Sequence, residues 1–172
     1  MKQLFLSSVV VAILATMFAG CEKIQSYPPV PKIVYKSFWL RDTSYLDTVN
    51  KGKAITLSFE FIDGDGDFGL FRPDSGETDT TKLFNLYLTS YQKINNQFVP
   101  DTSLLSELSF PIYYFDAMSR EGQNKTMEGS ISIVLELFDK LIKYDTIKYD
   151  FYIVDRALNK SNVETTPEIV LK

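Results

Sequence analysis

The stretch Ile55-Thr56-Leu57-Ser58-Phe59-Glu60-Phe61 alternates apolar and polar residues without interruption. Successive side chains of an extended strand point to opposite faces, so a period of two predicts a strand with one buried face and one exposed face. Residues 131–137 and residues 147–153 show the same period. The sequence therefore predicts β-strands as the main elements of the fold.

Shorter strand candidates are separated by polar turns and cover residues 33–40, 83–91, 97–99, 110–115 and 168–171. Asn95-Asn96 is expected to form a tight hairpin turn, because asparagine tolerates a positive φ. Residues 134–144 also satisfy helical spacing, and a short helix there or at residues 103–108 would leave the fold class unchanged. Seven or eight short strands predict an all-β fold, an immunoglobulin- or fibronectin-like sandwich of antiparallel strands.

Length and charge limit the classes of protein that fit. The chain has 172 residues, 45% of them hydrophobic, which suits one domain with a single core. Without the first twenty residues, 17 Lys and Arg would stand against 22 Asp and Glu, for a net charge of about −5. Such an acidic chain is not expected to bind nucleic acid, whose phosphates favour basic surfaces.

Histidine is absent from the chain and cysteine occurs once, as Cys21. These counts exclude a histidine-dependent nucleophile, a histidine-ligated zinc ion, and a disulfide or thiolate cluster within the chain. Any catalysis would have to come from carboxylates, lysine or tyrosine. We therefore expect a protein that is not an enzyme.

The first twenty residues have the parts of an export signal. Lys2 supplies the positive start, residues 9–18 are an apolar run, and Ala19 and Gly20 are small. The apolar run is shorter than the roughly 20 residues that span a bilayer. Residues 1–20 are therefore expected to be a cleaved signal peptide.

Phe18-Ala19-Gly20-Cys21 resembles the lipobox of bacterial lipoproteins, with Phe18 in place of the usual leucine. The resemblance implies that Cys21 is lipidated with acyl chains such as palmitate and becomes the new amino terminus. Such chains attach a protein stably to a membrane. The alternative is an ordinary secretory signal in which Cys21 has no special role.

The residues after the cysteine indicate a location and a tether. Glu22-Lys23 is similar to the short charged signals that send Bacteroidota-type lipoproteins to the surface of the outer membrane, and both the periplasmic and the surface face stay open. Residues 21–31 include Tyr27-Pro28-Pro29-Val30-Pro31 and are expected to be an extended tether. The folded domain is expected to cover residues 32–172.

The segment Asp63-Gly64-Asp65-Gly66-Asp67-Phe68-Gly69 follows the clearest strand. Three carboxylates at alternate positions, with glycines that let the backbone fold around a centre, are typical of a loop that binds Ca²⁺. The pattern differs from helix-loop-helix calcium loops, since a strand precedes it and Phe68 occupies the usual glycine position. Asp63, Asp65 and Asp67 are the candidate ligands of a structural Ca²⁺ ion, and the alternative is a solvated acidic turn.

Residues 155–161, Asp-Arg-Ala-Leu-Asn-Lys-Ser, resemble a turn found near the end of many bacterial immunoglobulin-like domains, with Leu158 in place of a glycine. Together with the aspartate-rich loop, they give residues 55–172 a resemblance to Bacteroidota-type envelope lipoproteins with a single immunoglobulin-like domain. The resemblance implies a fold and a location in the cell envelope. It implies no particular activity.

Three functions are compatible with these features. We expect a non-catalytic binding or structural module that contacts the membrane through its anchor and an envelope protein or glycan through its domain. The first alternative is a carbohydrate-binding lipoprotein of a glycan-uptake system, whose aromatic candidates are Trp39, Tyr113, Tyr114, Phe115 and Tyr152. The second is a carboxylate-dependent hydrolase, whose candidate acids are Asp63, Asp65, Asp67, Asp116, Glu136 and Asp155.

Overall fold

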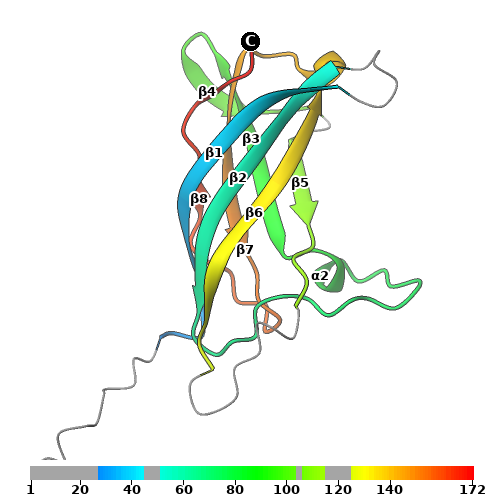
Figure 1. Ribbon diagram of the computed structural model, residues 1–172, viewed down its shortest axis with the longest axis vertical. Coiled ribbons are helices and arrows are strands. Elements are labelled where there is room, and N and C mark those ends of the chain that lie inside the picture. The colour runs from blue at the N-terminus through cyan, green and yellow to red at the C-terminus, as the bar shows by residue number, and fades with distance from the viewer. Residues whose placement is uncertain (1–26, 45–50, 104–105, 115–124) are drawn as a thin grey trace, which may run out of the picture.

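The computed structural model describes residues 27–44, 51–103, 106–114 and 125–172. These residues form an all-β fold of two antiparallel sheets that face each other (Figure 1). The export signal and Cys21 lie outside the described residues, as do Phe115 and Asp116. Within the described part of the chain, no helix is long and apolar enough to cross a membrane.

The first sheet has three long strands in the order β1-β2-β6. They are β1 (Lys32–Ser44), β2 (Lys51–Asp63) and β6 (Met127–Phe138). The central strand β2 contains the stretch with the clearest alternation, and its register places Phe59 opposite Tyr35 on β1 and opposite Ile131 on β6. A register shift in β1 follows Tyr35.

The second sheet has six strands, in the order β4-β3-β7-β8, with β5 also paired to β3 and β9 also paired to β7. Its strands are β3 (Leu86–Ile94), β4 (Gln97–Pro100), β5 (Glu107–Phe110), β7 (Thr146–Ile153), β8 (Glu164–Thr165) and β9 (Ile169–Val170). Two short helices complete the described elements, α2 (Thr80–Leu83) and the 3₁₀ turn η2 (Asp139–Leu141).

The hydrophobic core lies between the two sheets. The predicted inward faces are confirmed, because the apolar residues that alternate along β2 and β7 are buried and those at residues 131, 133, 135 and 137 of β6 are buried or half-buried. Phe59 and Phe151 meet across the layers with ring centroids 5.3 Å apart. Burial of these large side chains is the main force that holds the sheets together.

Several boundaries differ from the sequence prediction. The strand expected at residues 83–91 begins at Leu86, because residues 80–83 form α2, whose first turn is capped by the Asp79 side chain accepting from the Thr81 amide at 3.0 Å. A strand is expected at residues 110–115, but the strand in this region, β5, ends at Phe110. Tyr113 forms only an isolated β-bridge with Leu70. Residues 103–108, where the sequence also allows a short helix, include the start of β5, which pairs with β3.

The described residues form nine strands, because β8 and β9 are separate two-residue segments paired to β7. Within residues 134–144, which also satisfy helical spacing, β6 continues to Phe138 and residues 139–141 form the 3₁₀ turn η2. The predicted hairpin turn is confirmed, because Asn95 and Asn96 join β3 to β4 with φ of 49° and 63°.

One end of the molecule collects the segments that matter for the site. The loop after β2, the turn after β7 and the segments that lead into β1 and β6 all lie at the lower end in Figure 1. There the Gly64 amide donates to the Pro28 carbonyl at 3.1 Å. The last part of the expected tether therefore contacts the aspartate-rich loop.

Candidate metal centre

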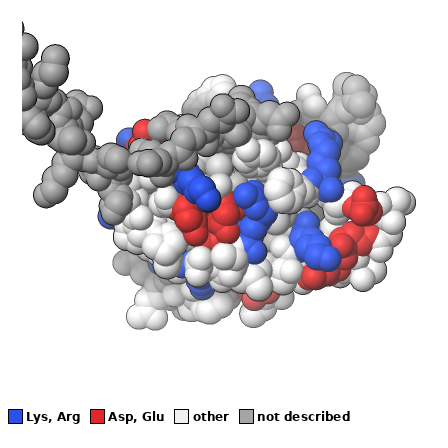
Figure 2. Space-filling model, turned by 90° about the horizontal axis from the view of Figure 1, so that it is seen from below, with Lys and Arg blue, Asp and Glu red and all other residues white. Residues whose placement is uncertain are grey.

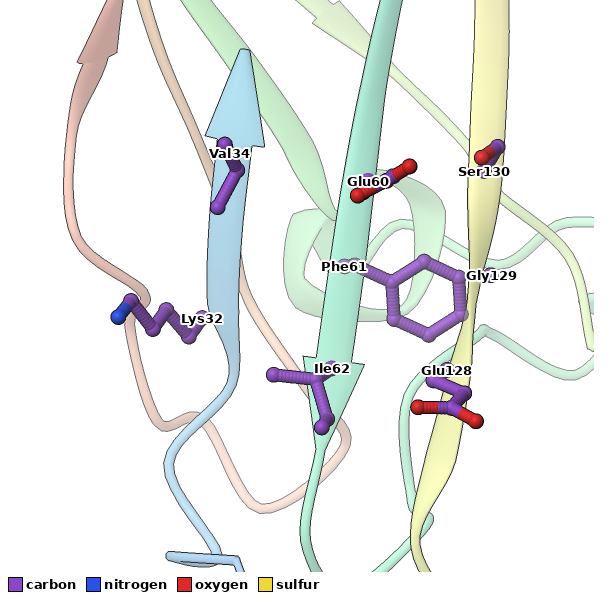
Figure 3. Close-up of a pocket in the computed structure, with 8 residues that line it drawn as sticks. All are labelled: Lys32, Val34, Glu60, Phe61, Ile62, Glu128, Gly129 and Ser130. Atoms are coloured by element: carbon purple, nitrogen blue, oxygen red, sulfur yellow. The ribbon is translucent and has the colours of Figure 1, made fainter. Parts of the chain in front are cut away.

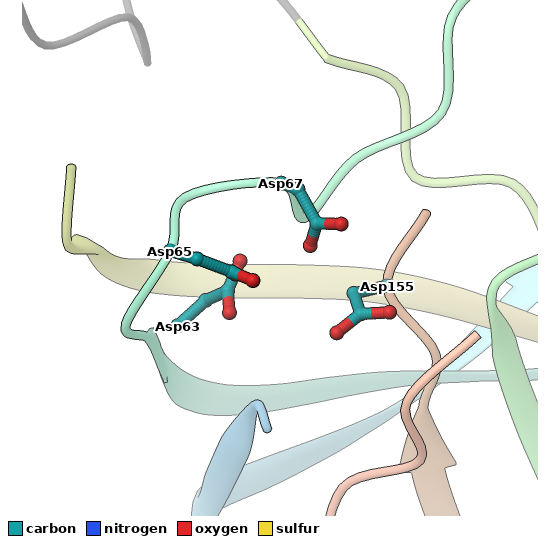
Figure 4. Close-up of side chains that lie close together, drawn as sticks. All are labelled: Asp63, Asp65, Asp67 and Asp155. Atoms are coloured by element: carbon teal, nitrogen blue, oxygen red, sulfur yellow. The ribbon is translucent and has the colours of Figure 1, made fainter. Parts of the chain in front are cut away.

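Four aspartates converge at the lower end of the two sheets. Asp63 is the last residue of β2, Asp65 and Asp67 follow in the loop, and Asp155 follows β7 (Figure 4). One carboxylate oxygen from each lies within 4.8 Å of the others. The structure thus brings together the three predicted ligands and adds Asp155, which the sequence offered only as one of several acids.

Glycines allow the loop to fold back over this end. Gly66 has a φ of +70°, and a Cβ atom there would overlap the Lys125 carbonyl oxygen. Phe68 turns inward, is fully buried and packs on Phe61 with ring centroids 4.7 Å apart. The buried phenylalanine and the permissive glycine together direct the aspartates toward one point.

Backbone amides fix the orientation of two carboxylates. The Phe68 amide donates to Asp63 Oδ2 at 2.8 Å, and the Ala157 amide donates to Asp67 Oδ2 at 3.0 Å. The second bond joins the loop after β2 to the turn after β7. The two segments that carry the aspartates are therefore held against each other by the site itself.

Asn159 holds Asp155 in place. Its amide donates to Asp155 Oδ1 at 2.7 Å, and its side-chain Nδ2 donates to Asp155 Oδ2 at 2.9 Å. Groups that hydrogen-bond a ligand in this way set its orientation in metal sites. Asp155 is 2% exposed, so its position is constrained by both packing and hydrogen bonds.

Two carboxylate oxygens in the cluster are buried without a hydrogen-bond partner among the described residues, Asp63 Oδ1 and Asp67 Oδ1. Asp63 is fully buried. Buried polar atoms are normally satisfied, and a buried charge is tolerated only when it is paired or bound to a metal. A cation bound among the aspartates would satisfy both oxygens.

The electrostatics of the cluster agree with that reading. Burial raises the pKa of Asp63 to about 7, and the charges of Asp65 and Asp67 add to the rise. Burial also raises the pKa of Asp67, with further contributions from Asp155 and Asp65. A bound cation would offset both the burial and the mutual repulsion.

The spacing of the oxygens suits Ca²⁺. Calcium binds oxygen ligands at about 2.3–2.6 Å, so two ligands on opposite sides of one ion are about 4.8 Å apart. The four aspartate oxygens lie within this limit. Mg²⁺, with ligands at about 2.1 Å, would require a smaller cluster.

The same spacing is less suitable for a carboxylate hydrolase. Glycosidases hold two carboxyl groups about 5–9.5 Å apart, on either side of a sugar ring. The four aspartate oxygens are closer than this, and Glu136 lies away from them on β6, in register with Ala54. The arrangement therefore favours cation binding.

The aromatic candidates that the structure describes do not form one strip. Trp39 is 64% exposed on β1, whereas Tyr152 stacks on Tyr87 in the other sheet with ring centroids 5.2 Å apart. Tyr113 and Tyr114 are half-buried beside the loop after β2. The exposed aromatic residue at the loop end is Phe71, which the sequence did not single out because its neighbours show no period.

The outer face of the three-stranded sheet has a hollow of about 430 Å³ (Figure 3). Its lining includes Lys32 and Val34 from β1 and Glu60 from β2, and the Phe61 ring lies beside Gly129, which has no side chain to cover it. Glu60 is paired with Lys36 at 2.8 Å. Because its polar groups are spread along three strands, this hollow is a weaker candidate site than the aspartate cluster.

No family model, curated protein or solved structure matches this chain. The function is therefore inferred from the positions and chemistry of its own side chains.

Proposed function

We propose that this protein is a lipid-anchored module of the bacterial outer membrane, with an immunoglobulin-like sandwich whose loop end binds a structural Ca²⁺ ion. It acts as a non-catalytic binding or structural component of the envelope. Asp63, Asp65, Asp67 and Asp155 are the proposed ligands, and Cys21 is the proposed site of lipidation.

The observation that carries the calcium proposal is the unpaired, buried oxygen of Asp63. It belongs to a fully buried carboxylate that faces three other carboxylates. Solvated acidic turns need no such burial, because water satisfies their oxygens. A divalent cation supplies both the charge and the coordination that the cluster lacks.

The immunoglobulin-like part of the proposal has separate support. The fold has two antiparallel sheets, and the turn after β7 is the one that resembles the turn of bacterial immunoglobulin-like domains. Leu158 stands where that turn has glycine, and its φ is 67°. A left-handed conformation at this position is what the glycine would provide.

Thermal unfolding of the mature chain tests the calcium proposal. Calcium at about 100 times its dissociation constant is expected to raise the free energy of unfolding of chelator-treated protein by about 2.7 kcal/mol. For a domain of this size, that is a rise in Tm of about 10 °C. Mg²⁺ at the same concentration is expected to give a smaller rise.

Asp65→Asn and Glu136→Gln form a matched pair of variants. Asp65 is exposed and in the cluster, so its replacement should abolish the response to calcium without harming the metal-free fold. Glu136 is exposed on β6, and its replacement should leave the response intact. A wild-type Tm that does not respond to calcium would refute the proposed metal site.

A further inference from the structure

A second hollow opens beside the aspartate cluster. It has a volume of about 440 Å³ and lies between the loop after β2, the helix α2 and the turn after β7. Figure 2 shows basic and acidic side chains next to one another on this end of the molecule. Sites for small ligands are commonly 300–1,000 Å³ in volume and combine apolar walls with a few polar groups.

Two large apolar side chains line the hollow and are exposed. Phe71 is 64% exposed and Leu158 is 59% exposed. Leu158 also has the left-handed backbone, which costs a residue with a Cβ atom on the order of 1–2 kcal/mol. An exposed leucine in a conformation suited to glycine gives the fold no advantage, and such strain is often found at binding sites.

The basic groups of the hollow differ in how they are paired. Lys82 forms an ion pair with Glu77 at 3.1 Å, whereas neither Arg72 nor Arg156 forms an ion pair with any described carboxylate. Arg72 lies over the Tyr113 ring, 5.4 Å from its centroid. Stacking holds the guanidinium group in place while its N–H donors stay available.

Arg156 is held more firmly. It lies over the Phe71 ring at 4.6 Å and donates from Nη1 to the Gly69 carbonyl at 2.6 Å. The hollow thus presents two fixed guanidinium groups, an apolar surface from Phe71 and Leu158, and the carboxylate of Asp74. Guanidinium groups bind carboxylates through paired hydrogen bonds.

We propose that this hollow binds an acidic saccharide, a sugar whose ring carries a carboxylate. The sugar carboxylate pairs with Arg72, and the apolar face of the ring lies on Phe71 and Leu158. Sugar hydroxyls donate to Asp74, whose ionised carboxylate is an acceptor only. An acidic peptide fits less well, because Asp74 and Glu77 would repel a run of carboxylates.

The two apolar walls of the hollow, formed by Phe71 and Leu158, follow the aspartate cluster in the chain. Phe71 comes after Asp67 in the loop after β2, and Leu158 comes after Asp155 in the turn after β7. The Ala157 amide donates to Asp67 Oδ2, so an ion that fixes both aspartates also fixes both walls. Saccharide binding is therefore expected to strengthen with calcium; this dependence rests on the proposed function, while the binding site itself rests on the hollow.

Calorimetric titration of the mature chain tests the inference with hyaluronan tetrasaccharide and with chitotetraose as a neutral sugar of the same length. The hyaluronan fragment is expected to bind at least tenfold more tightly than chitotetraose. Arg72→Gln should lower its affinity at least tenfold. Arg41→Gln is the matched control, since Arg41 stacks on Trp39 in the same way but far from the hollow along β1, and it should bind normally.

Leu158→Gly separates a binding role from a structural role. The glycine removes the backbone strain and the apolar contact together, so Tm is expected to rise while the affinity for the hyaluronan fragment falls. If the role of Leu158 were purely structural, its replacement would lower both Tm and affinity. Val163→Ala removes an exposed apolar side chain that does not line the hollow and should change neither.

Several results would overturn the inference. One is that the hyaluronan fragment fails to bind at millimolar concentration, and another is that chitotetraose or tetraglutamate binds as tightly as it does. A third is that Arg72→Gln binds the fragment with the affinity of the wild type. The titrations are run in calcium and in chelator. If binding depends on Arg72 and calcium has no effect on Tm, the saccharide site is supported and the metal site is refuted. If calcium raises Tm and the hyaluronan fragment does not bind, the metal site is supported and the saccharide site is refuted.

Discussion

Asp63 is a buried carboxylate at the end of a core strand, and its environment defines the site. One oxygen accepts from the Phe68 amide, and the other has no hydrogen-bond partner among the described residues. Such a group is stable either with a proton or with a cation beside it. Its pKa of about 7 means that the metal-free protein holds the proton at mildly acidic pH.

The raised pKa of Asp63 predicts how metal-free stability depends on pH. The unfolded chain releases this proton near pH 3.9 and the folded chain near 7, so the folded state binds more protons between those values. Stability is therefore expected to fall as pH rises from about 4.5 to 6.5, by up to roughly 1.4 kcal/mol per pH unit. Urea unfolding in metal-free buffer at a series of pH values measures this slope.

Asp63→Asn is the control for that slope. The amide keeps an oxygen for the Phe68 N–H and does not ionise, so the variant should show a flatter profile. With saturating calcium, wild-type stability should instead rise with pH, since only the ionised carboxylate binds the ion. Parallel metal-free profiles for the two proteins would contradict the environment described for Asp63.

At the residue scale, the sequence predicted the candidate ligands that are neighbours in the chain. Asp63, Asp65 and Asp67 could be predicted because their spacing with the glycines is itself a pattern. Asp155 could not, because it reaches the cluster only through the packing of β7 against β2. Arg72 could not be predicted either, because an exposed arginine in a loop belongs to no periodic pattern.

The turn after β7 is the element that joins the aspartate cluster to the hollow proposed to bind a saccharide. Asp155 faces the cluster, and Leu158, three residues later, lines the hollow. The turn is closed by the Leu158 amide donating to the Asp155 carbonyl at 3.2 Å and by the two bonds from Asn159. A change in this turn should affect both sites.

Asn159→Ala is expected to weaken calcium binding by about 10- to 100-fold, because one of the two bonds that orient Asp155 is lost. Asn162→Ala is the matched control. Asn162 bonds the Ile33 amide and carbonyl on β1, so its loss should lower stability without changing calcium affinity. Calorimetric calcium titration of both variants measures the difference, and equal affinities would contradict the role given to Asn159.

The elements with strong periodicity were the ones that could be predicted. Strands β2, β6 and β7 each bury one face of an alternating sequence, so their inward faces were known in advance. The helix α2 has four residues and depends on the cap from Asp79, which leaves no apolar pattern. The two-residue strand β8 has no such pattern and forms through its pairing with β7, whereas β9 lies within the strand predicted at residues 168–171.

The whole molecule carries its candidate sites at the end from which the chain leads back to Cys21. The bond from the Gly64 amide to the Pro28 carbonyl fixes that segment against the aspartate loop. Six residues separate Cys21 from Pro28, and an extended chain over those seven steps spans at most about 25 Å. In an anchored protein the two sites would therefore lie close to the membrane surface.

The all-β class could be predicted from the sequence, but the placement of the candidate sites at one end of the molecule could not. Strand order and the packing of the two sheets decide which loops share an end, and neither is encoded in local periodicity. Phe59 and Phe151 illustrate the point, because each strand shows its own inward face while their contact at 5.3 Å appears only in the folded molecule.

Membrane attachment is predicted to depend on one sulfur atom. The wild-type protein should partition with the membrane fraction, and its intact mass should exceed that of the polypeptide from residue 21 by the mass of the acyl chains. Cys21→Ser should be found in the soluble fraction. Retention of this variant in the membrane would refute lipid anchoring at Cys21.

The most direct test of the central claim is equilibrium dialysis of the mature chain against radioactive calcium. One ion per chain is expected for the wild type and for Glu136→Gln, and none for Asp65→Asn or Asp155→Asn at the same calcium concentration. Absence of bound calcium in the wild type, or binding by either aspartate variant equal to that of the wild type, would contradict a calcium site formed by the two loops.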